Sequence, residues 1–231
     1  MERIKTGIKG FDELLSGGFP SGRNVLISGT PGTGKTIFAL QYLYNGAKMF
    51  NEKGLFVTFE ENAENLRKQA KMFGWDLDKM EKSGKVKILS IEARDVKEST
   101  ARDIISIVRG GNYTRLVIDS LSALSINTPN SFGLVTDINE IFVKRFIYHF
   151  INDLRDVNCT SILISQAVEE QLSSDGASEF ACDGIIHIKY ENLGGDYSRH
   201  LSIRKMRETK NDEEIHPMEI GKEGVVIHSL R

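Results

Sequence analysis

The sequence predicts an α/β fold in which helices flank a largely parallel sheet, and the sheet continues into an antiparallel C-terminal extension. Short apolar runs alternate with longer helical patterns up to residue 165. A glycine-rich turn follows the first apolar run. From residue 184 onward, strand-like runs follow one another without a helical pattern between them. Strand–helix alternation is typical of parallel sheets, whereas consecutive strands without helices favour antiparallel pairing.

Each element of this prediction has its own local signal. Five apolar runs are predicted strands: 24–28, 55–59, 86–91, 116–118 and 161–165. Helical patterns lie between them over 36–49, 63–73, 101–108 and 143–157. Asn62 is a suitable N-cap for the second helix, and Gly74 is well placed to end it. Three further strands are predicted over 184–190, 201–206 and 225–228.

The composition excludes several classes of protein. The 231 residues correspond to one or two domains, and because no long linker or repeat interrupts them, we expect a single domain over 1–231. A net charge of −2 argues against a strongly basic nucleic-acid coat protein. Two cysteines cannot build a disulfide framework, and no apolar run approaches the ~20 residues that span a bilayer. We therefore expect a cytoplasmic protein without a membrane segment.

The first predicted strand runs into a phosphate-binding motif. The segment fits G-x-x-x-x-G-K-[ST] at every position: Gly29, Thr30, Pro31, Gly32, Thr33, Gly34, Lys35 and Thr36. Its glycines let backbone amides wrap around a phosphate, and the N-terminus of the following helix favours an anion. Lys35 supplies charge to the β- and γ-phosphates, and the Thr36 hydroxyl can bind Mg²⁺. The motif therefore predicts binding of ATP with Mg²⁺.

Acidic residues follow two of the other predicted strands. Asp119 ends an apolar strand, where a P-loop protein needs a carboxylate to hold Mg²⁺. Glu60 and Glu61 follow the strand after the P-loop helix. Because neighbouring strand residues point to opposite faces, we expect only one of the two to polarise the attacking water. We favour Glu60 as this general base and keep Glu61 as its competitor.

A polar residue also ends the fifth predicted strand. Gln166 comes directly after the apolar run 161–165. The carboxyl ends of parallel strands point toward a ligand bound at that edge of the sheet. Gln166 is therefore a candidate sensor of the γ-phosphate, with a solvated strand end as the alternative.

With these motifs in order, the chain resembles the KaiC-like branch of the RecA superfamily. The matching segments are 6–14, 17–23, the P-loop, Glu60-Glu61, 73–77, 118–120 and 201–207. The resemblance implies a RecA-like P-loop ATPase that forms a homo-hexameric ring with ATP between subunits. It also implies that Lys205 and Arg207 reach the ATP of the neighbouring subunit as a finger. Without the resemblance, this pair would be interpreted as solvated charges on a strand.

Two departures from the clock-type members of this family limit what the resemblance implies. Those members carry two such domains in tandem, whereas this chain has one. In their kinase half, adjacent Ser and Thr phosphosites precede the late strands, but Glu179 and Phe180 occupy these positions here. Neither side chain has a hydroxyl that could accept phosphate. Autokinase activity of the clock type is therefore not expected.

Other residue types give no sign of a different chemistry. No pair of histidines has H-x-x-x-H spacing, and the two cysteines do not form a Cys-x-x-Cys motif. The five histidines are His149, His187, His200, His216 and His228. We therefore expect no metal site other than that for Mg²⁺. Cys159 and Cys182 are interpreted as packing residues, as is Trp75, and the acidic run 212–214 as a solvated turn.

Three functions compete at this stage. The first is a slow Mg²⁺-dependent ATPase ring that acts as a regulatory switch. The second is an ATP-dependent DNA-binding protein related to recombinases or helicases. The segment 125–132, the candidate pore loop, contains no Lys or Arg, which disfavours nucleic acid as a partner. The third is an ATP-gated scaffold that binds a partner protein and hardly turns over.

Overall fold

The computed structural model describes residues 2–97, 99–126, 136–167, 171–191 and 198–229. The strands are β1 (Arg3–Ile4), β2 (Phe19–Pro20), β3 (Asn24–Gly29), β4 (Gly54–Thr58), β5 (Val86–Ser90), β6 (Arg115–Asp119), β7 (Thr160–Gln166), β8 (Gly184–Tyr190), β9 (Arg199–Met206), β10 (Ile215–Gly221) and β11 (Gly224–Ile227). The α-helices are α1 (Lys35–Met49), α2 (Ala63–Met72), α3 (Leu77–Lys82), α4 (Thr100–Gly111), α5 (Leu121–Ile126), α6 (Thr136–Arg155) and α7 (Ser178–Ala181). Two 3₁₀ turns, η1 (Asp12–Leu15) and η2 (Ala93–Asp95), complete the described elements.

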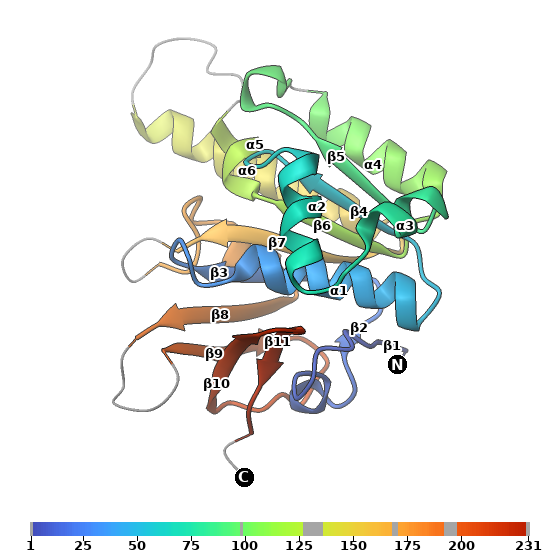
Figure 1. Cartoon of the computed structure of the whole chain (residues 1–231). Coiled ribbons are helices and arrows are strands. Elements are labelled where there is room, and N and C mark those ends of the chain that lie inside the picture. Colours follow the sequence, from blue (N-terminus) through green and yellow to red (C-terminus); the bar gives the residue numbers. More distant parts are fainter. Residues whose placement is uncertain (1, 98, 127–135, 168–170, 192–197, 230–231) are drawn as a thin grey trace.

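Within the described residues the main sheet has nine strands in the order β11-β10-β9-β8-β3-β7-β6-β4-β5. The strands from β8 to β5 are parallel, and β9, β10 and β11 pair antiparallel. In Figure 1 the antiparallel strands, in orange to red, lie at the end of the sheet nearest both chain termini. The predicted fold is thereby confirmed, with one adjustment. Because β8 pairs parallel with β3, the antiparallel extension begins one strand later than the sequence pattern suggests.

Helices cover both faces of the sheet, as the alternation of β3 side chains requires (Figure 1). Val25 and Ile27 pack in one core cluster with Phe38 of α1. Leu26 packs in the other cluster with Phe150 of α6. Because β3 is buried on both faces, the P-loop that follows it starts from a rigid position.

Several short elements were not predicted from the sequence, and α3 and β10 show why. Helix α3 has six residues, too few for a clear apolar period, and is capped by Asp76, whose carboxylate accepts a 2.9 Å bond from Lys79 N. Strand β10 contains Pro217, a residue that disfavours a strand interior. The predicted pore loop runs from the end of α5 into residues 127–132, which lie outside the described residues.

Candidate functional site

The P-loop connects β3 directly to α1, and its glycines are required by the backbone. Gly32 and Gly34 have φ angles of +80° and +99°, in the left-handed region that favours glycine. Gly29 has an extended conformation, but a Cβ atom there would lie 2.4 Å from the carbonyl oxygen of Ile188 on β8. The close approach of β8 therefore demands glycine at the first position of the motif.

Lys35 is the first residue of α1, and its ammonium group lies inside the loop. Its Nζ donates hydrogen bonds of 2.9 Å to the carbonyl oxygens of Gly29 and Thr30. Burial lowers the pKa of Lys35, while the nearby carboxylates of Asp119 and Glu60 oppose this shift. The loop thus holds a buried cation where phosphate oxygens would replace the two carbonyls as partners.

Thr36 and Asp119 come together from two different elements. Thr36 Oγ1 donates a 2.8 Å hydrogen bond to Oδ2 of Asp119, the last residue of β6. Asp119 is only 5% exposed, and burial raises its pKa to about 6. A hydroxyl and a carboxylate are the oxygen ligands that Mg²⁺ prefers, and Mg²⁺ usually needs only one or two from the protein. The donor set therefore fits the predicted ion.

The two glutamates after β4 lie in different surroundings. Ser120 Oγ donates a 2.5 Å hydrogen bond to Glu60 Oε1, which places this carboxylate beside Asp119. The charge of Glu60 also contributes more than that of Glu61 to the raised pKa of Asp119. Glu61 is held by its backbone instead, since its N–H donates to Thr58 Oγ1 and its carbonyl accepts from the same hydroxyl, both at 3.0 Å. The structure therefore brings Glu60 to the Lys35 and Asp119 cluster.

Gln166 lies beside the start of the P-loop. It is the exposed last residue of β7 and pairs in register with Gly29. The next residue, Ala167, donates its N–H to the Gly29 carbonyl at 3.1 Å. The residue after Gln166 is thus hydrogen-bonded directly to the first residue of the P-loop.

Lys205 and Arg207 lie at the opposite end of the sheet from the P-loop of their own chain. Met206 pairs with Gly184, whereas Gly29 pairs with Ile188, four residues farther along β8. At ~3.3 Å per residue these two levels are roughly 13 Å apart. Met206 is buried, while Lys205 is half-buried and Arg207 is exposed.

Both cations have partners within the chain. Lys205 Nζ donates to the carbonyl oxygens of Cys182 at 2.7 Å and Glu179 at 3.2 Å. Arg207 Nη1 and Arg155 Nη2 donate to the same Asp183 oxygen, at 3.2 and 3.1 Å. Arg23, Arg155, Asp183, Arg207 and Glu208 line a cavity of about 520 Å³ here. From the sequence, no role was predicted for Arg155, Asp183 or Ser120. Of the three, only Ser120 lies in a segment that the resemblance had singled out, 118–120.

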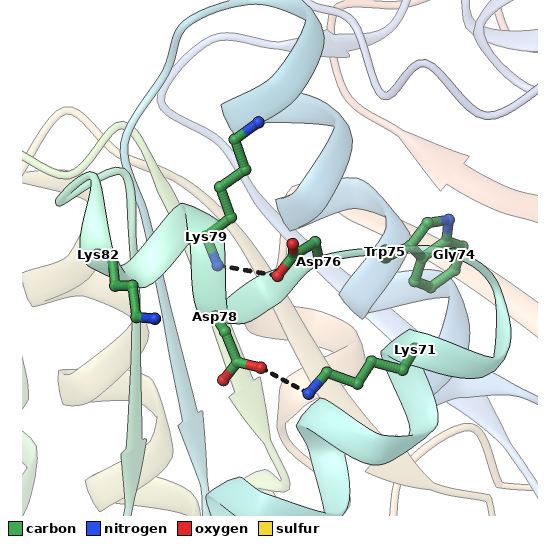
Figure 2. A pocket seen from close by; sticks show the side chains of 7 residues that line it. All are labelled: Lys71, Gly74, Trp75, Asp76, Asp78, Lys79 and Lys82. Carbon is green, nitrogen blue, oxygen red and sulfur yellow. Dashed lines mark hydrogen bonds and ion pairs between the residues drawn. The ribbon is translucent and has the colours of Figure 1, made fainter.

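A second cavity, of about 590 Å³, lies between α2 and α3 (Figure 2). Trp75 lines it but is only 5% exposed, and its ring stacks on Phe73 and Tyr44 with centroids 4.8 and 5.9 Å away. In Figure 2 the ion pair between Lys71 and Asp78 spans the cavity, at 2.7 Å. The predicted packing role of Trp75 agrees with its burial.

The fold and the site define a RecA-like P-loop ATPase, and comparison with known proteins gives the family. A family model described as "ATPase: KaiC" matches residues 4–231. A UPF0273 protein of Thermotoga maritima is 35% identical over 245 residues, covering 99% of this chain and 96% of that protein. The circadian clock oscillator protein KaiC of Synechococcus elongatus is 33% identical over 234 residues, but this chain covers only 44% of its length.

A solved structure gives the same result. The KaiC-like protein from the hyperthermophilic archaeon Pyrococcus horikoshii OT3 has a TM-score of 0.86 and 37% sequence identity, with 99% of both chains covered. The chain belongs to the KaiC family of ATPases. Within the described residues, no helix is long and apolar enough to cross a membrane.

Proposed function

We propose that this protein is a slow Mg²⁺-dependent ATPase whose single domain, residues 1–231, assembles into a homo-oligomeric ring, a hexamer, and acts as a regulatory switch. The observation that carries the proposal is the cluster of Lys35, Thr36, Asp119 and Glu60. These four residues come from three separate segments of the chain and meet at one edge of the sheet.

The chemistry at this cluster follows from what each side chain can do. The P-loop amides and Lys35 would hold the triphosphate, and Thr36 and Asp119 would hold the ion. When bound, Mg²⁺ would neutralise charge that develops on the β- and γ-phosphate oxygens. Glu60 accepts a proton from the attacking water, and the Ser120 hydroxyl keeps its carboxylate in place. Glu61 remains the competing base.

The position of Lys205 and Arg207 supports a trans arrangement. They lie about four strand residues away from the level of their own P-loop. A triphosphate that they contact would therefore be bound to the P-loop of another subunit. A contact in which one surface meets a different surface of the next copy closes into a ring when the rotation allows it. In such a ring, Lys205 and Arg207 would stabilise the charge of the neighbour's γ-phosphoryl group.

Sedimentation and turnover together test the proposal. We expect assembly that an ATP analogue strengthens, since a ligand bound between subunits stabilises the interface by mass action. ATP turnover is then measured with and without single-stranded DNA. Slow turnover that DNA leaves unchanged supports the switch, whereas strong stimulation would favour the recombinase-like alternative. Tight binding without turnover would indicate an ATP-gated scaffold. A monomer at micromolar concentration with and without the analogue would contradict the ring.

A further inference from the structure

Three potential metal ligands meet where the connection after β9 enters β10. They are Asp212, Glu214 and His216, and their ligand atoms all lie within 4.8 Å of one another. The residues are spaced by two, and an extended chain places such residues on the same side. This spacing differs from the usual zinc motifs, and the sequence pattern alone therefore predicts a solvated turn over 212–214.

His216 is the most informative of the three. Its side chain is only 2% exposed. Among the described residues, neither of its ring nitrogens has a hydrogen-bond partner. Its Nε2 lies 3.2 Å from Oδ1 of Asp212, in a contact that lacks hydrogen-bond geometry. Since buried polar groups are nearly always hydrogen-bonded, this imidazole needs another partner.

We propose that Asp212, Glu214 and His216 bind a divalent transition-metal ion, with Zn²⁺ as the reference ion. Zinc bonds of 2.0–2.1 Å in tetrahedral geometry separate neighbouring ligand atoms by about 3.3 Å. The 3.2 Å between His216 Nε2 and Asp212 Oδ1 matches this separation. One imidazole and two carboxylates suit zinc, whereas Mg²⁺ prefers oxygen ligands alone. Three protein ligands leave the fourth position to water.

The site would fasten the connection between β9 and β10 to the body of the protein. Asp212 N donates a 3.0 Å bond to the carbonyl of Leu14, and Ser16 Oγ donates a 3.2 Å bond to the carbonyl of Lys210. These contacts already join the connection to the N-terminal segment around η1. A bound ion would add a link to β10, because His216 belongs to that strand. We therefore expect the ion to raise the midpoint of thermal unfolding.

Isothermal titration of the tag-free full-length protein tests the site directly. The protein is first treated with EDTA, exchanged into chelator-free buffer without nucleotide, and titrated with ZnCl₂. The ligand variants are Asp212→Asn and Glu214→Gln. Glu213→Gln is the matched control, since Glu213 is an exposed acid outside the cluster. Asp119→Asn separates this site from the carboxylate near the P-loop. Circular dichroism confirms folding of each variant.

We expect one Zn²⁺ per chain in the wild type, in Glu213→Gln and in Asp119→Asn. Loss of a direct ligand should weaken binding at least tenfold, since even second-shell changes cost about 10–100-fold. Zinc should raise the unfolding midpoint only in the proteins that bind it, and Co²⁺ should give the intense visible absorption of tetrahedral coordination. No stoichiometric binding by the wild type would overturn the proposal. So would equal binding by all variants, or loss of binding in Asp119→Asn alone.

Discussion

The hydroxyl of Ser120 donates a 2.5 Å hydrogen bond to Oε1 of Glu60, joining the first residue after β6 to the second residue after β4. This contact holds one of two adjacent glutamates beside Asp119, the carboxylate that we propose as the Mg²⁺ ligand. We expect Glu60→Gln to keep ATP binding and to slow hydrolysis by about 10²–10⁴-fold, because general-base catalysis is typically worth that much. Single-turnover hydrolysis is the measurement.

Glu61→Gln is the matched control for this prediction, because it makes the same change one residue farther along the chain. We expect it to hydrolyse ATP at close to the wild-type rate. If Glu61→Gln alone slows the reaction, Glu61 and not Glu60 is the base.

Lys35→Ala should abolish tight ATP binding. The substitution removes the ammonium group that now bonds to the carbonyls of Gly29 and Thr30, and with it the P-loop cation for the β- and γ-phosphates. Isothermal titration with ATP and Mg²⁺ measures the loss. Lys48→Ala, an exposed position in the last turn of the same helix, is the control and should bind normally. A folded Lys35→Ala protein with unchanged affinity would refute the P-loop assignment.

Arg207→Ala should bind ATP and turn it over poorly, because the neighbouring subunit would lose its finger. A finger of this kind typically raises the rate of hydrolysis by about 10³–10⁵-fold. For a slow ATPase we expect an increase near the lower end of this range. Mixing Arg207→Ala with Glu60→Gln should restore partial turnover. Where the two kinds of subunit adjoin, the Arg207→Ala subunit supplies an intact Glu60 and the Glu60→Gln subunit supplies an intact Arg207 to the same ATP. Full activity of Arg207→Ala alone would show that Arg207 is only a solvated residue.

His187 should make the protein less stable in mild acid. Burial, with help from the charges of Lys189 and Arg204, lowers the pKa of His187 to about 4 from an ordinary value of 6.5. Between pH 6.5 and pH 4 the unfolded chain therefore binds more protons than the folded chain, so the free energy of unfolding falls as the pH falls. Above pH 6.5 both states carry neutral imidazole, and this effect is absent.

The change in unfolding free energy across this window should be on the order of 1–3 kcal/mol. His187→Gln should remove most of it, as measured by urea unfolding at several pH values. His149→Gln, at an exposed position, should keep the wild-type dependence. If His187→Gln shows the same pH dependence as the wild type, the half-buried imidazole of His187 is not its cause.

The sequence predicted those features of the site that depend on neighbours along the chain. The P-loop and its lysine follow from an eight-residue motif, and Asp119 and Glu60 follow from their positions at strand ends. The separation of Arg207 from its own P-loop could not be predicted, because it depends on the register between β8 and β9, which local patterns do not encode. Strand β10 was missed because Pro217 interrupts its pattern. The buried surroundings of His216 depend on the folded chain as well.

The central place of β3 in the sheet has a consequence for synthesis on the ribosome. This strand is made at residues 24–29, but its two neighbours are β7, at 160–166, and β8, at 184–190. This strand, which is fully buried in the folded protein and leads into the P-loop, therefore lacks both of its native partners until most of the chain has emerged. Such unpaired strands invite aggregation, and non-local parallel pairing is slow. A nascent chain stopped before residue 160 would have the whole P-loop motif and still lack both strands that pair with β3.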